Sequence, residues 1–277
     1  MHKPGWPLLT LPVYDALVKA RDAGHERLDV SLDLGRSMHP VRVDPDRWHA
    51  DGAPYPFPQR CKDRTIYHWD GESFEVVSRF GTSLLKLVPT DWGPPTFEID
   101  GIKMLPTSKI SPFEDAAAKV RLIEPRGKTV LDTCGGLGYF AHWCLAGDAE
   151  RVQSFEKNPD VLWLRTVNPW SPGSDDPRLD LRLGDVSESI ATLPAASVDA
   201  VLHDPPRFGI AGELYSQAFY DHVARVLRPR GRLFHYTGSP NRLTSGRDVP
   251  QEVSVRLKRA GFTTEVIGDG VLARLGR

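Results

Sequence analysis

The feature that most constrains the fold is a regular alternation of two kinds of segment, which begins at Ser111 and runs to the end of the chain. Short β-prone runs such as "KTVLD" and "RVQSFE" are each followed by a stretch whose apolar residues recur with helical spacing. This alternation predicts parallel strands joined by helices, because two parallel strands need a long crossover connection. The last two runs, 263–269 and 270–276, are joined by a tight turn, so we expect them to be antiparallel. Residues 111–277 are therefore predicted to form an α/β domain with a doubly wound sheet.

The first 110 residues follow a different pattern, with short β-prone runs and a single helical segment at 12–23. Asp70-Gly71 and Asp100-Gly101 each stand between two such runs, and this dipeptide is typical of tight hairpin turns. We therefore predict that residues 1–110 form a smaller, β-rich N-terminal module that takes part in substrate binding.

Composition excludes several classes of protein. The three cysteines form no CxxC pair, which argues against a disulfide framework and against a zinc site, so no metal is expected. No apolar run approaches the ~20 residues of a membrane span, and the N-terminus lacks the pattern of a signal peptide. We expect a cytoplasmic protein. Residues 207–277 carry twelve Lys/Arg against six Asp/Glu, which indicates either a basic face or an ordinary solvated surface.

A glycine-rich turn joins a predicted strand to a predicted helix in "VLDTCGGLGYFA", residues 130–141. Such a turn lets a ligand approach the backbone at a helix N-terminus. The spacing Gly136-x-Gly138-x-x-Ala141, with Glu156 following 20 residues after Gly136, matches a dinucleotide-binding fingerprint. The turn could also do no more than connect the two elements.

The same turn resembles the first motif of class I S-adenosylmethionine-dependent methyltransferases, in the form Asp132-x-x-x-Gly136-x-Gly138. Cys134 stands where that family has a further glycine. The resemblance implies a Rossmann-like sheet whose last strand is antiparallel, with residues 111–277 as the methyltransferase domain.

Four successive predicted strands end in a carboxylate, at Asp132, Glu156, Asp185 and Asp204. Parallel strands bring their carboxyl ends to one edge, where doubly wound folds bind ligands. Asp132 could meet the cationic amino group of S-adenosylmethionine but would repel a pyrophosphate, and Glu156 could accept ribose hydroxyls from either cofactor. Asp185 resembles the residue that binds the adenine amino group. Each carboxylate could instead cap a helix. We predict S-adenosylmethionine as cofactor, bound by Asp132, Cys134, Gly136, Gly138, Glu156 and Asp185.

Asp204-Pro205-Pro206 resembles the (Asp/Asn)-Pro-Pro-aromatic motif of methyltransferases that modify exocyclic amino groups of nucleobases. Such an amino nitrogen is a poor nucleophile because its lone pair is delocalised into the ring. A carboxylate and the carbonyl of Pro205 can hold its two N–H bonds and direct the lone pair at the methyl donor. We predict these three residues to be catalytic. Arg207 replaces the aromatic residue and Phe208 follows it, although the segment could also be a proline-stiffened loop.

Further candidates for substrate contact are Tyr215, on the predicted helix 212–227, and His235-Tyr236, at the end of the next strand. The segments "IYHWDGESFEVV", "NPWS", "HDPPRFGIAGELYSQAFY" and "GRLFHYTG" together resemble a group of archaeal-type predicted methyltransferases. That group is associated with N4-methylation of cytidine in small-subunit ribosomal RNA, so the resemblance implies this activity and RNA as partner.

Two other classes of function fit parts of the pattern. An aminopropyltransferase or small-amine methyltransferase uses a similar fold and a similar aspartate, and a non-catalytic RNA-binding module could retain the pocket. A polyamine pocket should carry several carboxylates, whereas residues 205–245 hold six arginines against Glu213 and Asp221. This count favours an anionic polymer as substrate.

Overall fold

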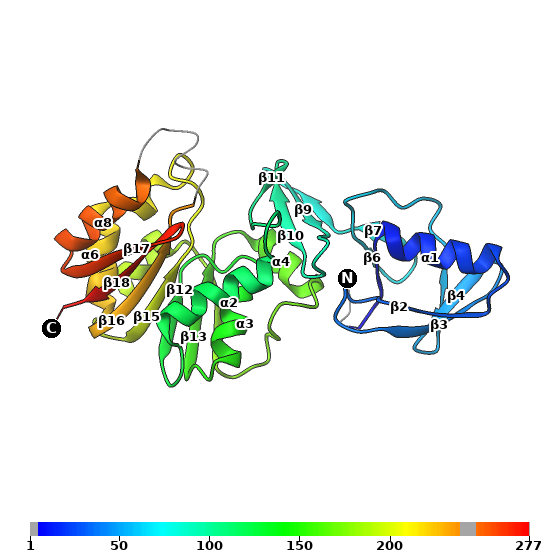
Figure 1. Cartoon of the computed structure of the whole chain (residues 1–277), viewed down its shortest axis with the longest axis horizontal. Coiled ribbons are helices and arrows are strands. Elements are labelled where there is room, and N and C mark those ends of the chain that lie inside the picture. Colours follow the sequence, from blue (N-terminus) through cyan, green and yellow to red (C-terminus); the bar gives the residue numbers. More distant parts are fainter. Residues whose placement is uncertain (1–4, 239–247, 277) are drawn as a thin grey trace. The chain divides into compact units, whose positions relative to one another are not determined.

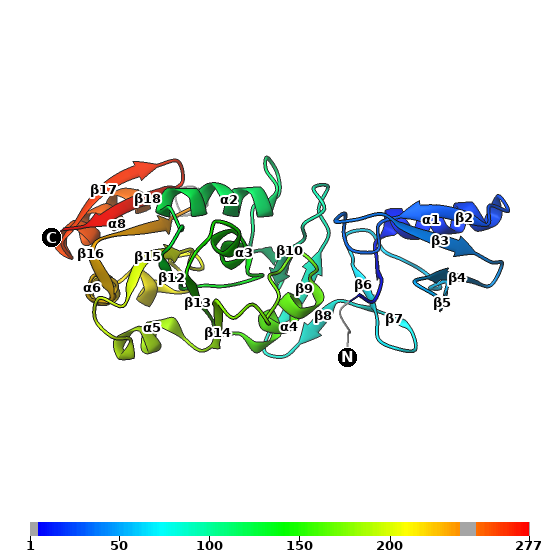
Figure 2. The same cartoon turned by 90° about the horizontal axis from the view of Figure 1, so that it is seen from below.

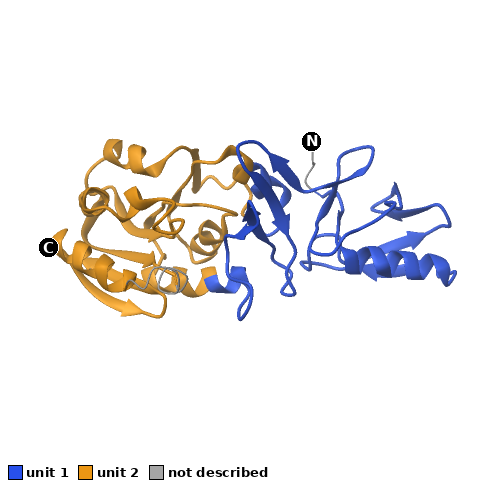
Figure 3. Ribbon diagram, turned by 90° about the horizontal axis from the view of Figure 1, so that it is seen from above, with its two compact units in different colours: residues 1–115, 163–171 blue, residues 116–162, 172–277 orange. Residues whose placement is uncertain are grey.

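The computed structural model describes residues 5–238 and 248–276, which form two compact units (Figure 3). The first unit comprises residues 1–115 and 163–171, and the second comprises residues 116–162 and 172–277. The second unit therefore holds most of the segment for which the sequence predicts a doubly wound sheet.

From residue 5 onward, the first unit contains one long helix and three small antiparallel sheets (Figure 1). Its elements are β1 (Leu8–Leu9), α1 (Leu11–Asp22), β2 (Arg27–Val30), β3 (His39–Val43), β4 (Arg47–Ala50), β5 (Ala53–Pro56), β6 (Tyr67–Trp69), β7 (Phe74–Val76), β8 (Ser78–Phe80), β9 (Leu84–Val88), β10 (Thr96–Ile99) and β11 (Ile102–Lys103). The strand orders are β1-β6-β7, β2-β3-β4-β5 and β11-β10-β9-β8. One face of the β2–β5 sheet carries the fully buried Trp48 of β4, which belongs to a hydrophobic cluster that also includes residues of α1.

Both predicted hairpins are confirmed. Strands β6 and β7 pair on either side of Asp70, whose Oδ1 accepts the backbone N–H groups of Glu72 and Ser73. Strands β10 and β11 pair around Asp100-Gly101, where φ is +50° and +77°. Positive φ at both central residues is the geometry in which a two-residue turn matches the twist of its strands.

The second unit is built on a seven-stranded sheet of order β14-β13-β12-β15-β16-β18-β17. Its strands are β12 (Thr129–Asp132), β13 (Arg151–Glu156), β14 (Leu179–Leu183), β15 (Val198–His203), β16 (Leu227–Tyr236), β17 (Phe262–Ile267) and β18 (Gly270–Leu275). Its helices are α3 (Tyr139–Ala146), α5 (Val186–Ser189), α6 (Gln217–Val226) and α8 (Val249–Arg259). Two more, α2 (Pro112–Ile123) and α4 (Pro159–Val167), are divided between the two units after residues 115 and 162. Strand β18 runs antiparallel to both of its neighbours, β16 and β17. The pairs β14-β13, β13-β12, β12-β15 and β15-β16 are all parallel. This is the predicted α/β class I methyltransferase topology with its antiparallel last strand.

The prediction of one continuous helix over 212–227 is wrong. A 3-10 turn at Gly212–Tyr215 is followed by a break at Ser216, and α6 begins only at Gln217. The extended Ser216 accepts the N–H of Phe219 through its side chain at 3.1 Å, which starts a new helix with an N-cap. The 3-10 turn and α6 are therefore two separate helical segments.

The core of this unit lies between the sheet and α6, whose buried face carries Phe219, Tyr220, Val223 and Val226. These residues recur at helical spacing and cover the sheet next to β16. Because β14, β13, β12, β15 and β16 are parallel neighbours, their carboxyl ends meet at one edge of the sheet (Figure 2). None of the helices in residues 5–238 and 248–276 combines the length and the apolar character that a membrane span requires.

Candidate active site

The glycine-rich turn follows β12 and ends at the N-terminus of α3. Gly136 and Gly138 have φ of +50° and +82°, the left-handed region that residues with a Cβ rarely adopt. Gly138 is the N-cap residue of α3, and the N–H of Gly135 donates to the carbonyl of Phe155 on β13 at 2.7 Å. Backbone atoms therefore frame the first turn of α3, which is the arrangement that helix N-termini use to bind polar ligands.

Cys134 fits into this turn as a neutral packing group. Its enclosure raises the pKa of the thiol well above the ordinary value, through burial first and the nearby Glu156 carboxylate second. This direction favours the neutral thiol, which is a poor nucleophile. Its small size agrees with the place that the related motif gives to glycine.

Glu156 ends β13 and holds the glycine turn in place. Its Oε2 accepts the backbone N–H of Gly136 at 3.0 Å, and its Oε1 accepts that of Asn158 at 2.9 Å. The side chain is partly exposed, so it remains accessible beside the turn. This position fits the predicted role as acceptor for ribose hydroxyls.

Asp132 and Asp185 have contacts with their own chain that the sequence pattern does not reveal. Asp132 is fully buried, and its Oδ2 accepts the hydroxyl of Ser154 at 2.8 Å. Asp185 caps α5, since its Oδ1 accepts the N–H and the hydroxyl of Ser187 at 2.8 and 2.7 Å. Although burial opposes it, these bonds and the Lys157 ammonium lower the pKa of Asp185. Their contacts with a cofactor stay predictions.

Asp204 follows β15 directly and lies at the same sheet edge as the glycine turn. Strands β12 and β15 are paired so that Asp132 lies opposite Leu202, two residues before Asp204. The Asp204 side chain is 21% exposed, and its Oδ2 lies 3.4 Å from Nζ of Lys119 on α2. Sequence reasoning missed Lys119 altogether.

Tyr215 supports the Pro205-Pro206 turn through a hydrogen bond and a ring contact. The hydroxyl of Tyr215 donates to the carbonyl of Pro206 at 3.1 Å, and the rings of Phe208 and Tyr215 meet edge to face with centroids 5.4 Å apart. Pro205 is buried and Arg207 is exposed. Tyr215, predicted as a substrate contact, is 2% exposed and acts here as a support for the Pro-Pro turn.

His235 lies beneath this turn in a buried polar cluster. Its Nε2 accepts from the Tyr220 hydroxyl at 3.0 Å, and its Nδ1 donates to the carbonyl of Tyr236 at 3.0 Å. The centroids of the His203 and His235 rings are 4.4 Å apart. The His203 ring forms hydrogen bonds with the carbonyl of Leu214 and the hydroxyl of Thr133. His235 is fully buried and both of its ring nitrogens form hydrogen bonds, so it supports the core here and does not face a substrate. Tyr236, the other predicted substrate contact, is partly exposed.

These two histidines make folding stability depend on pH. Burial lowers the pKa of His203 from 6.5 to about 4 and that of His235 well below its ordinary value. Between about pH 6.5 and 4 the unfolded chain therefore binds protons that the folded chain does not, so acidification favours unfolding. We expect His203 alone to remove about 3 kcal/mol of unfolding free energy by pH 4, since a tenfold difference in proton affinity between the two states corresponds to about 1.4 kcal/mol.

Urea unfolding between pH 7.5 and 4.5 checks this expectation. The loss of stability on acidification should shrink in His203→Gln and persist in His222→Gln, a change at a partly exposed position of α6. Equal losses in both variants would contradict it.

The structure weakens the argument from arginine counts. Arg225 donates to the carbonyls of Ile190, Ala191 and Leu193, and Arg228 pairs with Asp199. Arg232 pairs with Glu124. Arg207 and Arg230 are exposed, and Arg242 lies outside the described residues. Half of the six arginines therefore have partners within their own chain.

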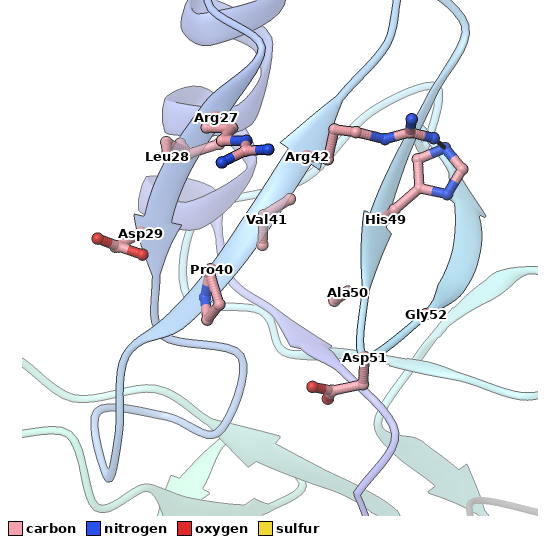
Figure 4. Close-up of a pocket in the computed structure, with 10 residues that line it drawn as sticks. All are labelled: Arg27, Leu28, Asp29, Pro40, Val41, Arg42, His49, Ala50, Asp51 and Gly52. Carbon is pink, nitrogen blue, oxygen red and sulfur yellow. Dashed lines mark hydrogen bonds between the residues drawn. The ribbon is translucent and has the colours of Figure 1, made fainter.

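A shallow hollow lies on the outer face of the β2–β5 sheet in the first unit (Figure 4). Arg27 and Arg42 stand directly opposite one another on β2 and β3, and Arg42 bonds to His49 on β4. Asp29 and Asp51 also line it. Because the hollow carries both signs of charge, it does not by itself favour an anionic ligand.

Comparisons with known proteins agree with the fold. Residues 149–244 match a family model described as S-adenosyl-L-methionine-dependent methyltransferase. An uncharacterised protein of Methanocaldococcus jannaschii is 44% identical over 195 residues, 70% of this chain and 66% of that protein. Polyamine aminopropyltransferase 2 of Streptomyces coelicolor is 29% identical over 191 residues, 65% of this chain and 33% of that protein. The matches thus span about two thirds and one third of these relatives.

Solved structures of spermidine synthases show the same fold. One in complex with the transition state analogue AdoDATO has a TM-score of 0.57 at 18% identity, covering 71% of each chain. The enzyme from Thermotoga maritima has a TM-score of 0.54 at 19% identity, covering 71% of this chain and 70% of that one.

The strand order and the glycine turn are those expected for class I methyltransferases, and residues 149–244 match the model of a family of S-adenosylmethionine-dependent methyltransferases, whose cofactor is S-adenosylmethionine. The residues fit that cofactor, since a partly exposed carboxylate lies beside a turn of left-handed glycines at a helix N-terminus. The family match agrees with the predicted enzyme class and cofactor.

Proposed function

We propose that this chain transfers a methyl group from S-adenosylmethionine to the exocyclic amino nitrogen of a nucleobase in RNA, with cytidine of ribosomal RNA as target. The observation that carries the proposal is the placement of Asp204-Pro205-Pro206. The three residues follow β15 at the sheet edge that also bears the glycine turn after β12. A braced turn with a partly exposed carboxylate is suited to hold a planar amino group.

The cofactor, when bound, supplies an electrophilic methyl group on a sulfonium. Glu156 ends β13, and Asp185 follows the neighbouring strand β14 by two residues. These are the residues that would hold the adenosine part of the cofactor, with the backbone of the glycine turn beside Glu156. Asp132 would support the turn from inside, because its carboxylate is tied to Ser154.

The amino group that receives the methyl group would be held by two fixed hydrogen-bond acceptors. Asp204 and the carbonyl of Pro205 would each accept one N–H bond of the amino group, which takes electron density out of the ring and restores a nitrogen lone pair. Proline limits the backbone freedom of the turn, and Tyr215 fixes the following carbonyl. The nitrogen loses one proton on methylation, and the Asp204 carboxylate can take it.

Incubation with S-adenosylmethionine labelled in its methyl group tests this function. Total RNA from a strain that lacks the gene should accept label, and nucleoside mass spectrometry should find it as N4-methylcytidine. Label in another nucleoside would change the target, and no label in any RNA would refute the proposal.

Aminopropyl transfer is a second candidate, because relatives named polyamine aminopropyltransferase match 65% and 59% of this chain. This activity requires a sulfonium donor that carries an aminopropyl chain, and a polyamine as acceptor. Supplying that donor with 1,4-diaminobutane distinguishes the candidates, since only the second predicts a triamine product.

A further inference from the structure

Lys119 is a buried cation at the acceptor side of the site. It lies on α2 in the second unit, and its side chain is 8% exposed. Its Nζ lies 3.4 Å from Oδ2 of Asp204 and 3.6 Å from the ring centroid of Tyr236. The ring of Phe140 on α3 is a further neighbour at 5.8 Å.

These neighbours are those that stabilise an ammonium ion away from water. A carboxylate compensates the charge directly, and an aromatic face attracts a cation through its quadrupole. Three elements of the second unit therefore converge on Lys119: the end of β15, the end of β16 and the first turn of α3. The positive charge is therefore held directly beside the Asp204 carboxylate.

This charge distinguishes between two kinds of amine. The amino group of a nucleobase is uncharged, whereas an alkylamine is protonated at neutral pH. A cation that bonds to Oδ2 of Asp204 would lie within about 6 Å of Nζ, since a hydrogen bond is about 2.9 Å long. Repulsion at that distance weakens binding roughly 10- to 100-fold at the effective dielectric of a protein surface.

We propose that Lys119 is a specificity-determining residue, which admits neutral aromatic amines to Asp204 and rejects alkylammonium ions. This inference rests on the proposed function, because it assigns the acceptor to one class of amine. The ammonium supplies the repulsive element that discrimination between similar ligands requires. It also orients the carboxylate for the uncharged amine.

Affinity for a cationic probe tests the role of Lys119 without any assay of activity. Calorimetric titration with 1,4-diaminobutane, in the presence of S-adenosylmethionine, should give weak binding for the wild type and binding at least about tenfold tighter for Lys119→Met. Lys119→Arg keeps the charge and should keep the weak binding. Lys258→Met removes one charge from the exposed side of α8 and should also leave it weak.

The outcomes separate the two proposals. Equal diamine affinities in the wild type and Lys119→Met, or an arginine variant that behaves like the methionine one, would overturn the role of Lys119. Thermal unfolding of each variant shows whether it is folded, and Lys119→Gln serves if Lys119→Met is not. Absence of RNA methylation by the wild type would refute the proposed function. The titration would still show whether Lys119 weakens the binding of a cationic amine.

Discussion

Replacing Asp204 with alanine is expected to lower turnover by ~10²–10⁴-fold while leaving the affinity for S-adenosylmethionine nearly unchanged. The carboxylate is the acceptor that would hold the amino group and take its proton. It lies after β15, whereas Glu156 ends β13 and Asp185 caps α5, which follows β14. Single-turnover rates with labelled cofactor measure the first quantity, and calorimetry measures the second.

Two variants make this result interpretable. Asp204→Asn keeps an oxygen that accepts a hydrogen bond but cannot take a proton, so it should retain more activity than alanine if orientation dominates. Asp221→Ala removes an exposed carboxylate of α6 and should behave as wild type. Wild-type turnover in Asp204→Ala would exclude this residue from the chemistry. Because Asp204 pairs with Lys119, the unfolding transition of each variant must also be compared with that of the wild type.

The architecture of the second unit could be predicted because it depends on local signals. Alternating strand and helix patterns require crossovers, and the short link between Ile267 and Gly270 leaves room for nothing but an antiparallel turn. The break at Ser216 was missed although its signal is local. Serine is a good N-cap, but the apolar residues on both sides of it continue the helical spacing.

The support of the site could not be predicted, because it comes from residues distant in sequence. Lys119 precedes Asp204 by 85 residues, and the hydrogen bond from Thr133 to His203 spans 70. In the sequence, Lys119 has the character of a surface residue on an amphipathic helix. The structure buries it together with its neighbours Ala117 and Val120. Which polar groups meet in a core follows from packing, which no spacing rule describes.

Replacing Glu156 with alanine is expected to weaken the binding of S-adenosylmethionine about 10- to 100-fold, the range of one or two hydrogen bonds to a charged group. The change removes the predicted acceptor for the ribose hydroxyls. It also leaves the N–H groups of Gly136 and Asn158 without the carboxylate that fixes them, so the turn at the start of α3 loses its order. Calorimetry with the cofactor measures the loss.

Glu150→Ala is the matched control for this change, since Glu150 is exposed and immediately precedes the other end of β13. Glu156→Gln should fall between the two, because an amide oxygen accepts one of the N–H groups without the charge. Unchanged affinity in Glu156→Ala would remove this residue from the cofactor site. At saturating cofactor, Glu156→Ala should recover much of its turnover while Asp204→Ala should not, because the first defect lies in binding and the second in the chemical step.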